Sequence, residues 1–419
     1  MEWKRVVVTG MGAVTPIGNS LPLFSDGLMQ GRNGCSPIST FDTTQFRTKF
    51  ACTIKDFHPE DFFDRKEIKK LDPFGQYALV SADEAIKDAA LLDFPELNKN
   101  RVGVLFTSGF GGVKTFEDEL FQYFSNGRNP RYFSPFFVPR MLLDLAGGNI
   151  SIKYGFKGIN FSIVAACASS TSALIDALNY IRLGKADVVV VGGSEASVTE
   201  VGIGAFGAMK ALSERNDNPL SASRPFDLDR DGFVMGEGAG CMVIESLEHA
   251  QKRNARIYAE LAGGALNADA YHITAPHPEG ASVIQVMKEA LEDAGITADH
   301  IDYINVHGTS TPLGDIAEVK AIQQVFGNHA YDLNISSTKS MTGHLLGAAG
   351  VIEAIASVLS LLKNKVPPTI NHFTDDPAFD NNLNFTFTEA QDKNINAVMS
   401  NNFGFGGHNA SVVFKRFEY

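Results

Sequence analysis

The stretch Phe161–Arg182, FSIVAACASSTSALIDALNYIR, decides the fold. Its opening residues, Phe161–Val164, are apolar and partly β-branched, which predicts a short buried strand. A run of small residues follows, and after it apolar residues recur at the spacing of a helix. Cys167 therefore lies where a strand turns into a helix, between neighbours that are too small to crowd it.

A thiol in this position can act as a nucleophile. The N-terminus of a helix carries a partial positive charge and unpaired N–H groups, which favour the thiolate. The thiolate is the attacking form in covalent catalysis. A free cysteine is also a common apolar filler of protein cores. The interpretation of Cys167 as a nucleophile therefore depends on a base and an oxyanion site elsewhere in the chain.

The composition is that of a globular protein whose main partner is not nucleic acid. The chain has 419 residues, of which 44% are hydrophobic and 20% charged. Asp and Glu number 48 against 36 Lys and Arg, so the formal net charge is −12. A strongly acidic protein is repelled by nucleic acid unless it carries a local basic patch.

The cysteines and the first residues indicate where the protein works. The cysteines, Cys35, Cys52, Cys167 and Cys241, are scattered and form no C-x-x-C pair, so we expect neither a metal site nor a disulfide framework. The N-terminal residues lack the apolar core of a signal peptide, and no run is expected to span a bilayer. These features predict a cytoplasmic protein with no membrane partner.

Strands and helices alternate in two rounds, which we assign to halves 1–252 and 253–419. Such alternation predicts α/β layering with a mostly parallel sheet in each half. The strands are expected at Val6–Thr9, Arg101–Thr107, Asp187–Val191, Ile257–Gly263, Ile301–Val306, Leu333–Ser336, Ala397–Asn402 and Ser411–Phe414. The helices are expected at Ile17–Gln30, Pro73–Leu92, Ser282–Ala294, Gly314–Phe326 and Leu345–Leu362.

Three stretches imitate known motifs and fail on one residue each. Gly10–Thr15 lacks the third glycine of a dinucleotide fingerprint. Gly192–Ala196 has alanine where the esterase elbow needs its last glycine. Asp227–Gly232 begins like a calcium loop, but the twelfth position is Gly238 and not glutamate. We therefore expect no nucleotide, esterase or calcium site.

Two histidines follow predicted strands of the second half. His307 ends the strand Ile301–Val306, and His344 follows Leu333–Ser336 by a few residues. Catalytic groups of open α/β sheets gather at the carboxyl ends of strands. A single histidine there is usually an ordinary hydrogen-bonded residue, but two of them together with Cys167 favour catalysis. No third ligand at a familiar spacing supports a metal site.

A glycine-rich segment follows a strand near the C-terminus. In Asn401–Asn409, three glycines surround Phe405. Bare N–H groups in a mobile loop of this kind can reach a developing oxyanion, although the segment alone could equally be a glycine-rich hairpin. Further ordered blocks stand at Pro225–Gly240, His307–Asp315 and Lys339–Gly350.

Together these blocks resemble the β-ketoacyl-acyl carrier protein synthases, condensing enzymes of thiolase-like fold. The resemblance covers essentially the whole chain, and the Cys-His-His set with a GFGG segment is most similar to the elongating type II enzymes. It implies two similar α/β halves with mixed sheets, stacked as α/β/α/β/α layers. It also implies decarboxylative condensation of acyl-acyl carrier protein with malonyl-acyl carrier protein in fatty acid elongation.

The resemblance implies a role for each matched residue. Cys167 would accept the acyl group, while His307 and His344 would hold the malonyl thioester oxygen. Lys339 and Glu353 match a charged pair that orients the histidines. Phe405 would gate the site and join Cys167 in donating N–H groups to the oxyanion. Further matched positions are Gly404 and Gly406 at the gate and Thr309, Thr311, Thr274 and Phe403 at the substrate.

The family likeness also implies partners. An acyl carrier protein would dock on local lysines, and it would bring the phosphopantetheine arm, so no resident cofactor or metal is expected. A homodimer is expected from the family. The docking positions are Lys66, Lys69, Lys70 and Lys210.

Several alternatives remain open from the sequence. A thiolase acting on coenzyme A thioesters would need a second cysteine near the C-terminus, but Cys241 is the last one. A chain-length subunit of a polyketide system usually lacks the active cysteine. A polyketide or aryl-polyene ketosynthase keeps all three residues, and a Cys-His hydrolase would release free acid. His408 stands where many relatives have threonine, which could alter the motion of the loop.

Overall fold

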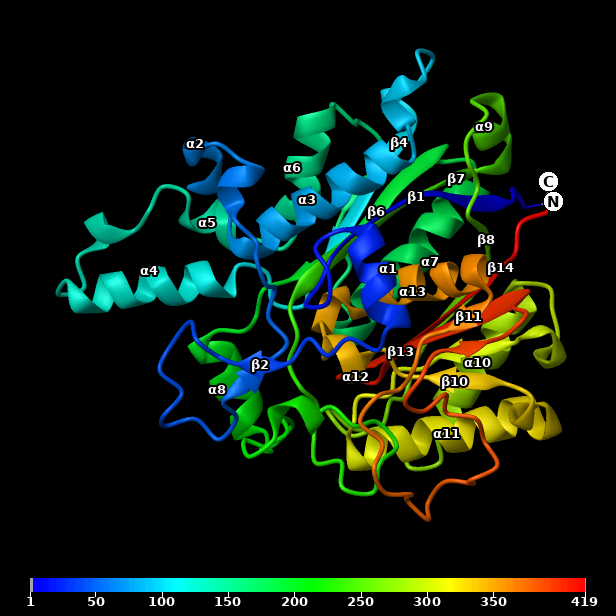
Figure 1. The fold of residues 1–419 in the computed structure, drawn as a ribbon. Coiled ribbons are helices and arrows are strands. Elements are labelled where there is room, and N and C mark those ends of the chain that lie inside the picture. Colours follow the sequence, from blue (N-terminus) through cyan, green and yellow to red (C-terminus); the bar gives the residue numbers. More distant parts are fainter. Residues whose placement is uncertain (1–2, 419) are drawn as a thin grey trace.

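A mixed sheet of ten strands runs through the part of the chain that the computed structural model describes, residues 3–418 (Figure 1). Its strands are β1 (Val6–Val14), β4 (Val102–Thr107), β5 (Asn160–Phe161), β6 (Val188–Glu195), β7 (Gly238–Ser246), β8 (Ala259–Ala268), β9 (Tyr303–Asn305), β10 (Asn334–Ser336), β13 (Ala397–Gly404) and β14 (His408–Lys415). Two small ribbons pair β2 (Ser36–Pro37) with β3 (Phe50–Ala51) and β11 (Lys365–Val366) with β12 (Gln391–Asp392).

Helices cover and separate the strands. They are α1 (Leu21–Met29), α2 (Arg65–Ile68), α3 (Pro73–Asp88), α4 (Val113–Ser125), α5 (Phe137–Met141), α6 (Leu145–Tyr154), α7 (Ser169–Arg182), α8 (Glu200–Ala208), α9 (Leu247–Lys252), α10 (Ala281–Asp293), α11 (Pro312–Phe326), α12 (Lys339–Thr342) and α13 (Ala349–Lys363).

The sheet is built from two halves with the same strand order. One half runs β5-β4-β6-β7-β1 and the other β10-β9-β13-β14-β8. If the five strands of each half are numbered in chain order, both halves have the spatial order 3-2-4-5-1, counted from the outer edge of the sheet to its centre. The halves meet where β1 pairs with β8, at Val7 opposite Glu260 and Val8 opposite Ala259. The two predicted α/β halves are therefore present, while the boundary after residue 252 stays a prediction.

The predicted sheet is mostly parallel, but only half of the observed strand pairs within each half of the sheet are parallel. Within residues 3–418, each half has two parallel strand pairs and two antiparallel ones. In the second half the cause is local, because only Phe405, Gly406 and Gly407 separate β13 from β14. A connection that short can join only antiparallel strands.

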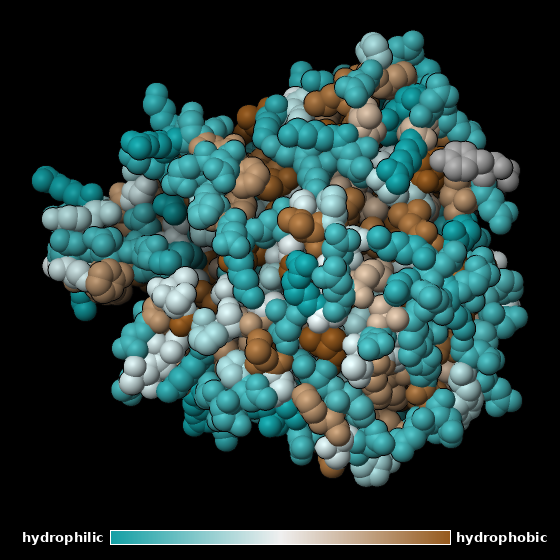
Figure 2. All heavy atoms as spheres, in the orientation of Figure 1, coloured by the Kyte–Doolittle hydropathy of each residue, from teal (hydrophilic) through white to brown (hydrophobic). Residues whose placement is uncertain are grey.

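The strands place apolar side chains on both faces. Along β6, Val189 and Val191 belong to a core that includes α7 and α13, whereas Val188 and Val190 belong to a core that includes α3. This alternation is the two-residue period of a strand. A third core lies among α10, α11 and the second half of the sheet. The helices α7 and α13 thus form the middle layer of the predicted α/β/α/β/α stack. On the outside, hydrophilic side chains cover most of the face of the protein shown in Figure 2.

One apolar run is longer than predicted. Residues Leu346–Lys363 reach a mean hydropathy of 1.7 over 18 residues, so the expectation that no run could span a bilayer is wrong by length and composition. However, 89% of this segment is buried inside the protein. Almost all of α13 is buried, because this helix lies between the two halves of the sheet.

Element boundaries differ from the predictions where motifs imitate turns. β1 continues through Gly10–Val14, and β6 continues to Glu195, so all but the last residue of the dinucleotide-like and of the esterase-like stretch belong to strands and not to loops. α3 ends at Asp88, short of Leu92. The predicted helix Ser282–Ala294 is confirmed to within one residue at each end by α10.

Candidate active site

Cys167 lies in a single 3₁₀ turn, Ala166–Ala168, between β5 and α7. The predicted strand Phe161–Val164 is wrong in extent, because β5 ends at Phe161 and Val164 is 56% exposed. Side chains replace the missing ladder: Ser162 Oγ donates to the carbonyl of Phe106, and Thr107 Oγ1 donates to that of Ile163.

The turn is held in an unusual conformation. Ala166 has φ 49°, in the left-handed region that non-glycine residues rarely adopt. Ser169 Oγ accepts from the N–H of Ala165 at 2.9 Å and donates to the carbonyl of Ala166 at 2.6 Å. These two bonds lock the sharp bend that aims Cys167 into the site.

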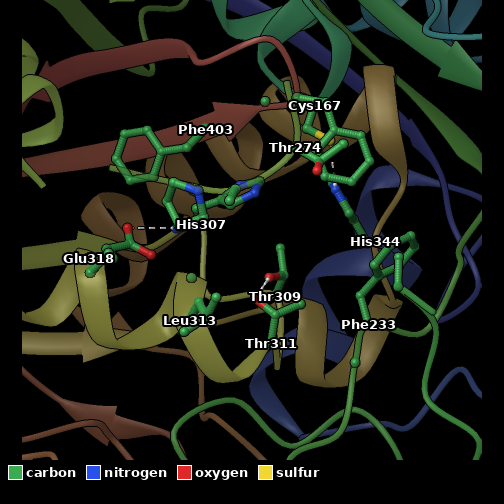
Figure 3. Close-up of a pocket in the computed structure, with 18 of the residues that line it drawn as sticks. Cys167, Phe233, Thr274, His307, Thr309, Thr311, Leu313, Glu318, His344 and Phe403 are labelled. Carbon is green, nitrogen blue, oxygen red and sulfur yellow. Dashed lines mark hydrogen bonds between the residues drawn. The ribbon is translucent and has the colours of Figure 1, made fainter. Parts of the chain in front are cut away.

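His344 is the nearest base. Its Nε2 lies 3.0 Å from Cys167 Sγ, and both residues are buried (Figure 3). The main chain of His344 is fixed from both sides, since its N–H donates to the carbonyl of Val234 at 2.7 Å and its carbonyl accepts from Gly236 at 2.9 Å. The Phe233 ring packs edge-on against the imidazole, with the ring centroids 5.3 Å apart. Together these contacts keep the imidazole directed at the sulfur.

His307 is the third residue of the site, together with Cys167 and His344. Its ring lies edge-on to that of His344, with the centroids 5.3 Å apart, and 5.7 Å from the ring of Phe403. The carboxylate of Glu318 accepts from the main-chain N–H of His307 at 2.9 Å and of Gly308 at 2.8 Å. The structure thus brings together three residues that are 140 and 37 positions apart in sequence.

Burial sets the charge states. It raises the pKa of the Cys167 thiol to about 12, although Lys339 and the hydrogen bond from the Phe405 N–H lower it. The helix N-terminus, which is expected to favour the thiolate, is therefore outweighed by burial of the thiol. Burial, and then Lys339, hold the pKa of both His307 and His344 well below the ordinary value. The resting site is a neutral thiol beside two neutral imidazoles.

A buried polar chain begins at Lys339, five residues before His344. Lys339 Nζ forms an ion pair with Glu353 Oε1, and both side chains are almost fully enclosed. Asn402 Nδ2 donates to Glu353 Oε2 at 2.7 Å, and Thr171 Oγ1 donates to Asn402 Oδ1 at 2.5 Å. This chain links the segment before His344 with α13, β13 and the helix of the nucleophile.

The GFGG segment is the turn of the β13–β14 hairpin. Of the two interpretations left open by the sequence, a hairpin is therefore the correct one, and it nevertheless reaches the active site. The N–H of Phe405 bonds to Cys167. A Cβ on Gly404 would lie 2.7 Å from the carbonyl oxygen of Ala165 and 3.0 Å from the nitrogen of Cys167, so only glycine allows this approach. His408 is exposed and pairs with Gly404 at the start of β14.

A cavity of about 440 Å³ opens over these groups. Cys167, His307 and His344 lie in its lining together with every predicted substrate position, Thr274, Thr309, Thr311 and Phe403 (Figure 3). Thr309 Oγ1 and Thr311 Oγ1 lie 3.0 Å apart. Lys210 also lines the cavity, whereas Lys66, Lys69 and Lys70 are exposed outside it, on and just after α2.

Sequence reasoning missed two residues of this site. Glu318 is buried under His307, and burial raises its pKa to about 7 even though two N–H groups stabilise the carboxylate. Phe233 packs on His344. Glu318 lies in the predicted helix Gly314–Phe326, but no local pattern reveals that it is buried or that it accepts from the N–H of His307. No grouping of three metal-ligating side chains occurs among residues 3–418.

Comparisons with known proteins agree with this geometry. The family profiles "Beta-ketoacyl synthase, N-terminal domain" and "Beta-ketoacyl synthase, C-terminal domain" match residues 3–250 and 258–373. The chain is 47% identical over 418 residues to 3-oxoacyl-[acyl-carrier-protein] synthase 2 of Synechocystis, covering 100% of this chain and 99% of the relative. It is 51% identical over 415 residues to the protein of that name from Staphylococcus aureus, covering 99% of each.

A solved structure extends the likeness to three dimensions. A type II polyketide ketosynthase in complex with its acyl-carrier protein, AntDE:AntF, superposes with a TM-score of 0.92 at 34% identity, covering 100% of both chains. The predicted thiolase-like α/β fold is therefore confirmed. The whole chain, with Cys167, His307 and His344 in one cavity, belongs to the β-ketoacyl synthase family.

Proposed function

We propose that the protein elongates fatty acyl chains by decarboxylative condensation of acyl-acyl carrier protein with malonyl-acyl carrier protein, giving 3-oxoacyl-acyl carrier protein. The observation that carries the proposal is the meeting of Cys167, His307 and His344 in one cavity. Relatives that are 47 to 51% identical are named for this reaction, whereas the polyketide ketosynthase is 34% identical. That difference favours fatty acid elongation over a polyketide or aryl-polyene pathway.

In the first half-reaction Cys167 accepts the acyl group. As the sulfur attacks the thioester carbon, His344 Nε2 takes the thiol proton across the 3.0 Å contact. The Phe405 N–H, released from the sulfur, donates to the developing oxyanion together with the N–H of Cys167. The tetrahedral intermediate then expels the phosphopantetheine thiolate, which recovers the proton from His344.

In the second half-reaction the malonyl group loses carbon dioxide. With the sulfur acylated, both imidazoles can donate an N–H to the malonyl thioester oxygen, where the enolate charge develops. The resulting carbanion attacks the acyl carbon, and Cys167 leaves as a thiolate that takes up one proton from solvent, which balances the carboxylate charge lost with carbon dioxide. Burial suits this step, because a charge developing in a site without water interacts more strongly with fixed donors.

The supporting residues follow from the geometry. Thr309 and Thr311 face the cavity and would bind the phosphopantetheine arm, which arrives on the carrier protein, so we propose that the enzyme has no resident cofactor. Lys66, Lys69, Lys70 and Lys210 are exposed and would receive the acidic carrier protein. We further propose a cytoplasmic homodimer. The four cysteines, all free, suit a reducing compartment.

The alternatives meet specific obstacles. A thiolase needs a second catalytic cysteine, but Cys241, the last in the chain, is fully buried in β7, away from the cavity lining. A chain-length subunit would not need a nucleophile, yet Cys167 faces the cavity with a base at 3.0 Å.

Mass spectrometry tests the proposal directly. Acyl-acyl carrier protein alone should leave one acyl adduct on Cys167, and adding malonyl-acyl carrier protein should convert it to one 3-oxoacyl product per carbon dioxide released. Release of free acid without condensation would identify a hydrolase. An adduct that persists on Cys167→Ala would refute the assignment of the nucleophile.

A further inference from the structure

Two further thiols lie close together outside the cavity. Cys35 and Cys52 are 5% and 1% exposed and belong to one small apolar cluster with Phe50, Ala222 and Val234. Both are free, and the proposed mechanism uses neither.

The strand register places these two cysteines opposite each other. The ribbon β2–β3 pairs Ser36 with Ala51 and Pro37 with Phe50, so the next pair in the same register is Cys35 with Cys52. The main chain of Cys52 bonds on its other side, donating to Met235 and accepting from Glu237.

Cys35 and Cys52 are therefore a non-hydrogen-bonded antiparallel pair. In such pairs the Cα atoms lie about 4.5 Å apart and the side chains are close, within the range of about 4.4–6.8 Å that disulfides span. The interaction with the Cys35 side chain, together with burial, raises the pKa of Cys52 well above its ordinary value, so Cys35 is the sulfur that attacks an oxidant first.

The pair is connected to the catalytic His344 through the main chain. Cys52 pairs with Gly236, and Met235 pairs in turn with His344, so these short segments form one small ladder. On the other side, Gly34 donates its N–H to the carbonyl of Met341 at 2.8 Å.

The residue before His344 packs directly on Cys52. A Cβ on Gly343 would lie 2.9 Å from Cys52 Sγ. The two thiols therefore border the segment that sets the position of His344.

We propose that Cys35 and Cys52 form a reversible disulfide that slows the chemistry at His344. Hydrogen peroxide is the oxidant. One sulfur attacks its O–O bond, giving a sulfenic acid and water, and the second thiol then attacks the sulfenic sulfur, forming the S–S bond and a second water. The two cysteine thiols together give two electrons to the peroxide. One phosphine molecule, or two molecules of an added thiol, supplies two electrons that reduce the disulfide again.

The bond changes the packing at His344. The two sulfurs of a disulfide lie about 2.05 Å apart, closer than two thiols can approach. Cys52 Sγ must therefore change its position, and with it the packing against Gly343, the residue before His344. Catalytic geometry is sensitive to displacements of this kind, since about 1 Å of misplacement can cost up to about 10²-fold in rate.

The disulfide itself is tested without substrate. Cys167→Ala protein, which lacks the reactive thiol of the cavity, is treated with hydrogen peroxide and digested with trypsin. Peptide 33–47 should appear linked to peptide 50–55, and the link should vanish in the added variants Cys35→Ala or Cys52→Ala. Unlinked peptides, or sulfinic acid at either cysteine in place of the link, overturn the proposal.

The effect on catalysis rests on the proposed function and is measured separately. Wild-type enzyme is loaded as the acyl-Cys167 thioester, which shields that sulfur, then oxidised, and condensation is followed in a single turnover with malonyl-acyl carrier protein. The rate should fall about tenfold and recover with a phosphine reductant, while Cys35→Ala, which keeps Cys52 Sγ beside Gly343, should show no change of rate on oxidation. An unchanged rate in linked wild-type enzyme overturns the regulatory role. Failure to load at all would instead count against the proposed function.

Discussion

His344 Nε2 lies 3.0 Å from Cys167 Sγ, and both groups are neutral at rest because burial opposes charge on either one. Such a pair becomes charged only as the sulfur attacks. His307 contacts the ring of His344 edge-on, with the centroids 5.3 Å apart. The two histidines therefore differ in what they can do, and substitutions should separate their roles.

His344→Ala should slow both half-reactions, whereas His307→Ala should slow only condensation. Loss of a general base costs about 10²–10⁴-fold, and loss of an oxyanion donor about 10²–10³-fold. Rapid-quench mass spectrometry of acyl-Cys167 measures loading, and formation of 3-oxoacyl product measures condensation. Equal loading rates in the two variants would show that His344 does not take the thiol proton.

The alkylation rate of Cys167 should keep rising with pH. Because the pKa of its thiol is raised to about 12, the thiolate fraction at neutral pH is small and increases about tenfold per pH unit. Iodoacetamide labelling between pH 6 and 10, followed by peptide mass analysis, should show no plateau in that range. A plateau beginning near pH 6 would mean that the resting pair is a thiolate and an imidazolium.

Breaking the Lys339–Glu353 pair should destabilise the fold. Both side chains are almost fully buried, so Glu353→Gln leaves an ammonium enclosed without its counter-charge, at a cost of about 3–5 kcal/mol. Denaturant unfolding measures this loss, and adding Lys339→Met should recover much of it. The exposed pair Lys365–Asp392 is the control, where Asp392→Asn should change stability by about 1 kcal/mol or less. Similar losses in both single variants would contradict the desolvation argument.

Features of this structure that depend on neighbouring residues in the sequence were predicted better than features that depend on contacts between distant residues. α10 was predicted almost to the residue, because its helical period and the glycine after it are local signals. The strand before Cys167 was overestimated, because Ser162 and Thr107 replace its ladder with side-chain bonds that no local pattern reveals.

The site shows the same difference between features set by local sequence and features set by contacts between distant parts of the chain. The identities of Cys167, His307 and His344 were available from motifs, but the burial that outweighs the helix N-terminus at the thiol was not. A helix N-terminus is a local feature, whereas burial depends on residues that only the fold brings around the sulfur. Glu318 was missed for the same reason, since its contact with His307 crosses from a loop to a helix.

Gly404→Ala should impair acyl loading without unfolding the protein. The added Cβ would meet the main chain of Ala165 at 2.7 Å, so the hairpin must move and carry the Phe405 N–H off the sulfur. Loss of one oxyanion donor predicts a fall in loading rate of about 10²–10³-fold. Gly207→Ala is a matched control, because nothing lies within 4 Å of its Cβ. Loading that survives in Gly404→Ala would exclude the Phe405 N–H from the oxyanion site.

Reversing charge at Lys66 and Lys69 should weaken the use of carrier-protein substrates. Both are exposed on or just after α2 and lie outside the cavity lining, so they can affect an acidic carrier protein without touching the acyl group. The double variant Lys66→Glu, Lys69→Glu should raise KM for acyl-acyl carrier protein about tenfold, with kcat little changed and the effect shrinking as salt screens the charges. Steady-state kinetics with a small acyl thioester should show no change.

Lys363→Glu, at the far end of α13 from His344, controls for net charge. An equal rise in KM for the small thioester would mean that these lysines shape the cavity and do not receive the carrier protein.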